Sequence, residues 1–203
     1  MLEYRTFTGG PFETNCYLIS APEGKILIDA PEGAAEFCRS EKVGLLLLTH
    51  AHFDHVLDAA RVAREHGCPI GAHPDGWAML SDPNSVRRLG LAYTYEPVKP
   101  TLTLREGAGQ SFLGLEFDLF LVPGHCPGSI CFYQPESGLL FCGDVLFSGG
   151  VGRWDLPGGD SELLFWGIRR KLYKLPSQTK VLPGHGIPTT IGTEMSSNPF
   201  VRG

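Results

Sequence analysis

The sequence predicts an α/β fold, in which short strands alternate with amphipathic helices. Four consecutive leucines, residues 45–48, make an apolar run without alternation, which is typical of a buried strand. Residues 56–66 space their apolar side chains as an amphipathic helix does, and Gly67 ends that pattern. Each strand-rich half of the chain leads into helical segments, without a repeat or a long linker. We therefore expect residues 1–203 to form a single domain.

The composition is that of a folded, water-soluble chain, with 42% hydrophobic and 19% charged residues among 203. A net charge of −5 argues against a nucleic-acid surface, which normally carries a basic patch. No apolar stretch approaches the ~20 residues of a membrane helix, and no secretory signal stands at the N-terminus. The six cysteines contain no C-x-x-C pair, which indicates reduced thiols. We expect a cytoplasmic protein without nucleic-acid or membrane partners.

The first half of the chain is predicted to form strands at residues 2–7, 16–20 and 25–29. Glycines and a proline at positions 9–11 separate the first two strands, and a Pro-Glu-Gly turn predicts a hairpin between the next two. A helix at residues 34–40 then leads into the leucine strand. After the amphipathic helix we expect a short strand at residues 69–72, and a loop-and-helix stretch over residues 75–100.

The second half begins with short apolar segments and glycine turns over residues 101–120, an antiparallel pattern. The glycine-rich residues 107–114 lack the spacing of a dinucleotide-binding loop, so a hairpin explains them better. Strands at 115–122, 129–133 and 138–141 follow, the last two joined as a hairpin. We predict a helix over 161–175, capped by Asp160 or Ser161 and basic toward its C-terminal half, and a strand at 180–182.

Four side chains that bind metals well follow the leucine strand: His50, His52, Asp54 and His55. Ligands of α/β proteins gather at the carboxyl ends of strands. Alternate side chains of an extended segment point the same way, so His50 and His52 can hold one cation together. Asp54 and His55 lie where the helix begins and face another point. The cluster therefore predicts two metal ions, since imidazoles and carboxylates at this density are typical of zinc and iron sites.

Three further candidates stand singly. His125 lies in a Pro-Gly turn after the strand at 115–122, and His185 lies in a second Pro-Gly turn after the strand at 180–182. Asp144 follows the strand at 138–141, where an aspartate can also merely cap a turn. His66 and His73 lie outside any cluster, and we interpret them as ordinary polar residues.

The segment T-H-A-H-F-D-H, residues 49–55, matches the H-x-H-x-D-H signature of the metallo-β-lactamase superfamily. Length and downstream motifs resemble the short glyoxalase II-like (hydroxyacylglutathione hydrolase) branch, from Asn15 to Phe200. The resemblance implies a four-layer αβ/βα sandwich of two mixed β-sheets with outer helices. It also implies that the C-terminal helical domain of full-length glyoxalase II is absent. The chain departs from its relatives after Asp29, where Ala-Pro replaces Pro-Gly, and at Cys126, where threonine is usual.

The resemblance also assigns the ligands. Metal 1 would be held by His50, His52 and His125, and metal 2 by Asp54, His55 and His185, with Asp144 and a hydroxide bridging the two. Asp54 would also orient the hydroxide, and Asp29 would be a buried structural residue beside the site. We expect two divalent metal ions, for which zinc is favoured and iron or manganese are alternatives. Cys126 is interpreted as a tolerated neighbour, not as a reactive thiol.

The predicted activity is hydrolysis of a small-molecule thioester such as S-lactoylglutathione by the metal-bridged hydroxide. Arg153 resembles the basic residue that holds glutathione in relatives, although an ion pair with Asp155 explains it equally well. One alternative is a mononuclear-iron persulfide dioxygenase, which shares the Gly-x-Gly-Arg loop of residues 150–153. For such an enzyme we expect Pro-Ala-His where this chain has Pro-Gly-His at 183–185.

Two other functions are less favoured by the sequence. A non-catalytic metal-binding module would usually be closed by four ligands, and the chain offers seven. A true β-lactamase typically has a cysteine ligand at the second zinc, where this chain has Asp144.

Overall fold

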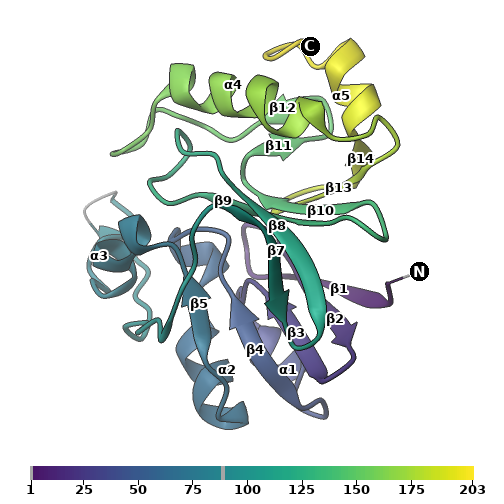
Figure 1. The fold of residues 1–203 in the computed structure, drawn as a ribbon. Coiled ribbons are helices and arrows are strands. Elements are labelled where there is room, and N and C mark those ends of the chain that lie inside the picture. The colour runs from purple at the N-terminus through teal and green to yellow at the C-terminus, as the bar shows by residue number, and fades with distance from the viewer. Residues whose placement is uncertain (1, 88–89) are drawn as a thin grey trace.

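Two six-stranded sheets packed face to face form the centre of the computed structural model, which describes residues 2–87 and 90–203 (Figure 1). The first sheet has the order β1-β2-β3-β4-β5-β6: Tyr4–Gly9, Thr14–Ala21, Gly24–Ile28, Val43–Leu47, Ile70–Ala72 and Leu102–Thr103. The second has the order β14-β13-β10-β9-β8-β7: Thr189–Thr190, Lys180–Pro183, Leu139–Gly143, Ile130–Gln134, Leu115–Leu121 and Gly107–Phe112. A small ribbon pairs β11 (Leu146–Phe147) with β12 (Gly150–Val151).

Both sheets are mixed, as predicted. In the first, β1, β2 and β3 are antiparallel and β3 to β6 are parallel. In the second, only β10 and β13 run parallel. The expected hairpins between β2 and β3, between β7 and β8, and between β9 and β10 are all present. The glycine-rich residues 107–114 thus lie in a hairpin and not in a nucleotide-binding loop.

The leucine run shows why a continuous apolar strand is needed at the centre. Leu45 and Leu47 pack between the two sheets, while Leu46 and Leu48 pack on the outer face toward the helices. Because alternate side chains point to opposite faces, a strand that is covered on both sides must be apolar throughout.

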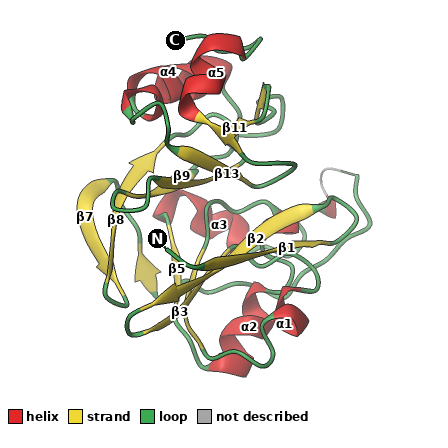
Figure 2. Ribbon diagram, turned by 90° about the vertical axis from the view of Figure 1, so that its right-hand side faces the viewer, coloured by secondary structure: helices red, strands yellow, loops and turns green. Residues whose placement is uncertain are grey.

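Helices cover the two outer faces (Figure 2). The short α1 (Ala34–Phe37) and α2 (Ala59–His66) lie on the first sheet, and α4 (Ser161–Arg170) and α5 (Ile191–Ser197) lie on the second. Asp160 caps α4, because its side chain accepts a hydrogen bond from the Leu163 N–H. The four-layer αβ/βα sandwich is therefore confirmed. No helix of the part of the chain described is long and apolar enough to span a bilayer.

Several predicted boundaries were wrong. Helix α2 begins at Ala59 and not at residue 56, because the preceding segment bonds elsewhere: Ala30 N donates to His55 O, and Asp58 N donates to Ala30 O. Residues 53–55 form the single 3₁₀ turn η1 instead (Phe53–His55). The helix predicted over 34–40 ends at Phe37, and the one predicted over 161–175 ends at Arg170, followed by the 3₁₀ turn η4 (Leu172–Lys174).

Two further stretches contain helices whose positions the sequence pattern did not predict. The predicted loop-and-helix stretch over 75–100 contains the 3₁₀ turn η2 (Pro74–Gly76) and α3 (Trp77–Leu80), while residues 88–89 lie outside the described residues. In the tail, α5 was not predicted, although the Thr190 hydroxyl caps it by accepting from the Thr193 N–H.

Candidate metal centre

The first ligand segment leaves β4 through Thr49, and a buried carboxylate fixes this residue. Asp29 accepts hydrogen bonds from the Thr49 backbone N–H at 2.8 Å and from its hydroxyl at 2.7 Å. The Thr49 hydroxyl also lies 3.0 Å from Nδ1 of His50. These contacts place the chain that follows at the carboxyl edge of the sheet. The predicted structural role of Asp29 beside the site is confirmed, since only 2% of the residue is exposed.

One cluster consists of imidazoles alone. His50, His52 and His125 each offer a ring nitrogen, and these three atoms lie within 4.8 Å of one another. Nδ1 of His52 is 2.7 Å from Nε2 of His125. The chain contributes His125 from the turn after β8, more than 70 positions away from His52. This is the set that the resemblance assigned to metal 1.

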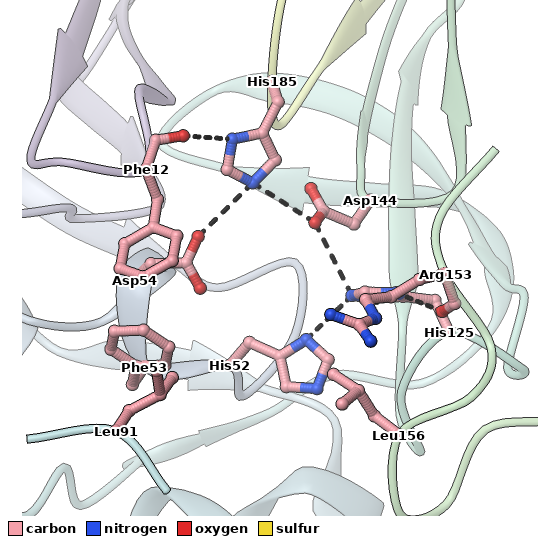
Figure 3. A pocket seen from close by; sticks show the side chains of 10 residues that line it. All are labelled: Phe12, His52, Phe53, Asp54, Leu91, His125, Asp144, Arg153, Leu156 and His185. Atoms are coloured by element: carbon pink, nitrogen blue, oxygen red, sulfur yellow. Dashed lines mark hydrogen bonds and ion pairs between the residues drawn. The ribbon is translucent and has the colours of Figure 1, made fainter. Parts of the chain in front are cut away.

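A second cluster consists of Asp54, His55 and His185, whose ligand atoms also lie within 4.8 Å of one another. Nε2 of His185 lies 3.3 Å from the Asp54 carboxylate. Figure 3 shows His185 above Asp54, with its ring directed at both this carboxylate and that of Asp144. This is the set assigned to metal 2.

Asp144 lies between the two clusters. One of its oxygens, Oδ2, is 3.6 Å from Nε2 of His125 and 3.3 Å from Nε2 of His185. The other, Oδ1, is 3.2 Å from Nε2 of His55. A carboxylate within reach of imidazoles from both clusters has the placement that a bridging ligand requires. The structure thus brings together all seven predicted ligand residues.

Each of four imidazoles is held by the ring nitrogen that faces away from the centre. Asp29 accepts from Nδ1 of His55 at 2.8 Å, and the Thr49 hydroxyl contacts Nδ1 of His50. Backbone carbonyls hold the other two: Nδ1 of His125 donates to Arg153 O at 2.8 Å, and Nδ1 of His185 donates to Phe12 O at 2.9 Å. Such contacts fix the tautomer and leave Nε2 free for a metal. Phe12 was not predicted, because a backbone carbonyl carries no signature of residue type.

Glycines allow the groups around Asp144 to approach closely. A Cβ atom on Gly184 would overlap Oδ1 of Asp144 and lie 2.6 Å from Cε1 of His55. A Cβ atom on Gly152 would overlap the Asp144 carbonyl oxygen and lie 2.9 Å from the His125 ring. Only glycine fits where a backbone passes this close to other groups. The glycine of the Pro-Gly-His turn at 183–185 therefore also lets Asp144 and His55 approach the backbone of that turn.

The two clusters differ in their acid–base character. In the all-imidazole cluster, burial and the neighbouring His125 lower the pKa of His52 to about 3, so its ring is neutral and able to ligate. In the other, burial alone would lower the pKa of His185, but hydrogen bonds with Asp144 and Asp54 raise it to about 10. Burial would also lower the pKa of His55, but the negative charges of the surrounding carboxylates raise it well above the usual value. A cation at this cluster would therefore compete with protons for the imidazole nitrogens.

The donor set fits divalent metal ions. Among the described residues, four buried side-chain atoms make no hydrogen bond, and three of them belong to this site: His50 Nε2, and His55 Nε2 and Asp144 Oδ1, which face each other at 3.2 Å only as an ion pair. Buried polar groups rarely remain unpaired, and a bound ion is one of the partners that can satisfy them. Imidazole nitrogens with carboxylate oxygens suit zinc, iron and manganese. The residues that would hold two cations are those of the two clusters, with Asp144 between them.

A cavity of about 340 Å³ opens onto both clusters (Figure 3). Five ligand residues reach its wall, and the other lining residues are mainly apolar: Phe12, Phe53, Leu91 and Leu156, with Arg153. A mostly apolar cavity with a few convergent polar groups is typical of a small-molecule site.

Arg153 takes part in both of the arrangements that the sequence left open. Its guanidinium forms a bidentate pair with Asp155, at 2.8 and 2.7 Å, and both side chains are more than half exposed. The same residue lines the cavity. Its backbone carbonyl has a third role, which the sequence did not predict, as the acceptor for His125.

The remaining candidates behave as structural residues. Cys126 is 1% exposed, and burial raises the pKa of its thiol to about 11, which makes it unreactive at neutral pH. His73 accepts a hydrogen bond from the Asp75 N–H, and Nδ1 of His66 lies 3.4 Å from the Val43 N–H, from which it can accept one. Neither histidine belongs to the metal clusters found among residues 2–87 and 90–203.

Comparisons with known proteins agree with this geometry. The family model described as "Metallo-beta-lactamase superfamily" matches residues 9–185. The chain is 39% identical to the hydroxyacylglutathione hydrolase GloC of Haemophilus influenzae, over 94% of each chain. It is 36% identical to a protein described as "Probable metallo-hydrolase YqgX" of Bacillus subtilis, over 100% of this chain and 99% of that one.

Two solved structures have the same fold over nearly their whole length. One is a protein named BLEG-1 B3 metallo-β-lactamase, with a TM-score of 0.89, 34% identity and coverage of 99% of this chain and 100% of that one. The other is TTHA1623 in a di-iron-bound form, with a TM-score of 0.87, 38% identity and coverage of 97% and 100%. Sequence motif, fold and relatives all agree, and the chain therefore belongs to the metallo-β-lactamase superfamily.

Proposed function

We propose that this metal-dependent hydrolase cleaves a small-molecule thioester, such as S-lactoylglutathione, with two divalent cations held by its two clusters. The observation that carries the proposal is the position of Asp144, whose carboxylate lies 3.2–3.6 Å from imidazoles of both clusters. A site with seven converging ligands exceeds the four that close a structural zinc site. Zinc is favoured, and iron or manganese are alternatives, since TTHA1623 was solved in a di-iron-bound form.

When bound, a pair of cations lowers the pKa of water and polarises an acyl oxygen. The protein residues prepare the site for this chemistry. Asp54 is held by the Thr14 hydroxyl at 2.8 Å and by His185. Burial alone would raise its pKa, but His55 and these hydrogen bonds lower it to about 2, so Asp54 accepts hydrogen bonds at neutral pH. As a carboxylate, Asp54 can both ligate a cation and accept a hydrogen bond from the attacking water.

The rim of the cavity suits a thiol that carries a carboxylate. Arg153 lines the cavity, and a guanidinium binds carboxylates in a bidentate manner. Its present partner Asp155 is exposed, so a substrate carboxylate can replace Asp155 in water at little cost. The relative GloC, named a hydroxyacylglutathione hydrolase, supports glutathione as the thiol half.

A second candidate is β-lactam hydrolysis, favoured by the likeness to the protein named BLEG-1 B3 metallo-β-lactamase. Asp144 counts against this candidate, because the family resemblance implies a cysteine at this position in a typical β-lactamase. The persulfide dioxygenase alternative is less favoured, because the alanine expected before its last histidine would overlap Asp144 at Gly184.

The test combines metal analysis with three activities measured on one preparation. We expect near two metals per chain, turnover of S-lactoylglutathione, and neither oxygen uptake with glutathione persulfide nor cleavage of a chromogenic cephalosporin. One iron per chain with oxygen uptake and no thioester turnover would assign the dioxygenase. Cephalosporin cleavage without thioester turnover would assign a β-lactamase.

Variants test the ligand assignment. Asp144→Ala and His52→Ala should abolish metal-dependent hydrolysis, whereas Cys126→Ser should keep most of it, because the thiol is buried and outside both clusters. Full rate and two metals in Asp144→Ala would contradict the bridging role.

A further inference from the structure

A second cavity, of about 220 Å³, adjoins the one at the metal centre. Three residues line both cavities: His52, Phe53 and Leu156. Because His52 is a member of the imidazole cluster, the two cavities meet beside the metal centre. The second cavity is hereafter the annex, and beyond the shared wall it is lined by Met79, Ser85, Val86 and Pro157.

Apart from the imidazole of His52 on the shared side and the hydroxyl of Ser85, the walls of the annex are apolar. Phe53 and Val86 are buried, at 8% and 2% exposure, and Met79 packs against the same core. The one hydroxyl in the lining, on Ser85, already lies 3.1 Å from the Tyr95 hydroxyl. Among residues 2–87 and 90–203, no acidic or basic side chain other than His52 lines the annex, whereas Arg153 and two carboxylates line the first cavity. A polar guest would therefore lose its hydrogen bonds to water in the annex without replacement.

We propose that the annex receives an apolar acyl chain of the thioester, so that the preferred substrates carry acyl groups of several carbons and not the small, hydroxylated lactoyl group. This inference rests on the proposed thioester hydrolysis. A carbonyl at the metal centre next to His52 has Phe53 and Leu156 as the wall that leads into the annex. The thiol half then remains in the first cavity, where Arg153 is the cationic partner for its carboxylates.

The selectivity follows from the burial of apolar surface. Each methylene group transferred from water into an apolar site contributes about 0.8 kcal/mol, which is roughly fourfold in kcat/KM. Glutathione thioesters with acetyl, butyryl and hexanoyl groups share one thiol half, so that only the acyl half varies. With the metal-loaded protein, kcat/KM should rise by roughly fourfold per methylene until the annex is filled.

Variants that change the size of the annex test whether it causes the dependence on acyl-chain length. Met79 is only partly buried, and Met79→Trp should fill the annex and lower the hexanoyl-to-acetyl ratio of kcat/KM at least tenfold. Val86→Ala should enlarge the annex and move the preferred acyl chain to a greater length. The matched control is Ile187→Ala, because Ile187 is 71% exposed and lines neither cavity, and this variant should keep the wild-type ratio.

The outcomes separate the two proposals. Hydrolysis of all three thioesters with a flat or falling dependence on chain length would overturn the annex proposal and leave the hydrolase intact. The same follows if Met79→Trp lowers all three rates equally while Val86→Ala leaves the preference unchanged. Absence of turnover with every thioester by a protein that contains two metals would overturn the thioesterase function and the annex with it.

Discussion

Replacement of Asp29 by asparagine removes one acceptor from beneath His55 while keeping the shape of the side chain. Asp29 is buried and has a positive φ of 60°, a conformation that asparagine also tolerates. Its carboxylate accepts three hydrogen bonds: one to Oδ1 from Thr49 N, and two to Oδ2 from the Thr49 hydroxyl and His55 Nδ1. An amide provides one oxygen for these three donors, because its nitrogen can only donate.

The consequence depends on how the asparagine amide is oriented, that is, on whether its NH₂ group takes the position of Oδ2 or of Oδ1. An NH₂ group at the Oδ2 position faces His55 Nδ1, which must then accept, so that its proton moves to Nε2 and blocks the nitrogen aimed at Asp144. The flipped amide instead leaves the buried Thr49 N–H without an acceptor. Loss of a contact that orients a ligand weakens metal binding by about 10- to 100-fold, or about 1.4–2.7 kcal/mol. Loss of one charged hydrogen bond lowers the free energy of unfolding by about 1.5–3 kcal/mol.

The assay is a zinc titration against a competing chelator, alongside denaturant unfolding in excess chelator. The matched control is Asp58→Asn, since Asp58 accepts hydrogen bonds from Gly33 N and Ala35 N, away from the clusters. Both bonds go to Oδ2, so the amide oxygen of asparagine can accept them, and that variant should keep its stability and bind zinc as the unaltered protein does. If Asp29→Asn bound both zinc ions with unchanged affinity, the role we assign to Asp29 in fixing the His55 tautomer would be wrong.

Three further predictions concern the centre and its rim. Gly184→Ala should lower the affinity for the second cation at least tenfold, because its Cβ would overlap Asp144. The control Gly150→Ala should keep both metals, because its Cβ would meet nothing closer than 3.6 Å; equal metal content in the two variants would refute this. Zinc at a hundredfold excess over the Kd of a site should stabilise the metal-free protein by about 2.7 kcal/mol per site, measured by denaturant unfolding; an unchanged midpoint would mean that no cation binds. Arg153→Ala should raise KM for S-lactoylglutathione about tenfold with kcat unchanged, and Asp155→Ala, which breaks the same ion pair, should not raise it.

The sequence by itself determined the chemistry of the centre. Its imidazoles and carboxylates are recognisable by residue type, and each follows a segment whose apolar pattern ends there, as Thr49–His55 follows the leucine strand. The leucine run was identifiable as a strand covered on both sides, since burial on two faces requires apolar side chains throughout. The resemblance added the sandwich, which the two mixed sheets confirm.

Tertiary structure alone decided what supports that chemistry and what surrounds it. The acceptors for His125 and His185 are the backbone carbonyls of Arg153 and Phe12, groups that every residue possesses and that no sequence pattern marks. The need for glycine at position 184 arises from the approach of Asp144, 40 positions earlier in the chain. The annex likewise joins residues from α3, the 3₁₀ turn η1 and the loop after β12. Such features depend on distances between segments remote in sequence, and packing of the two sheets sets those distances.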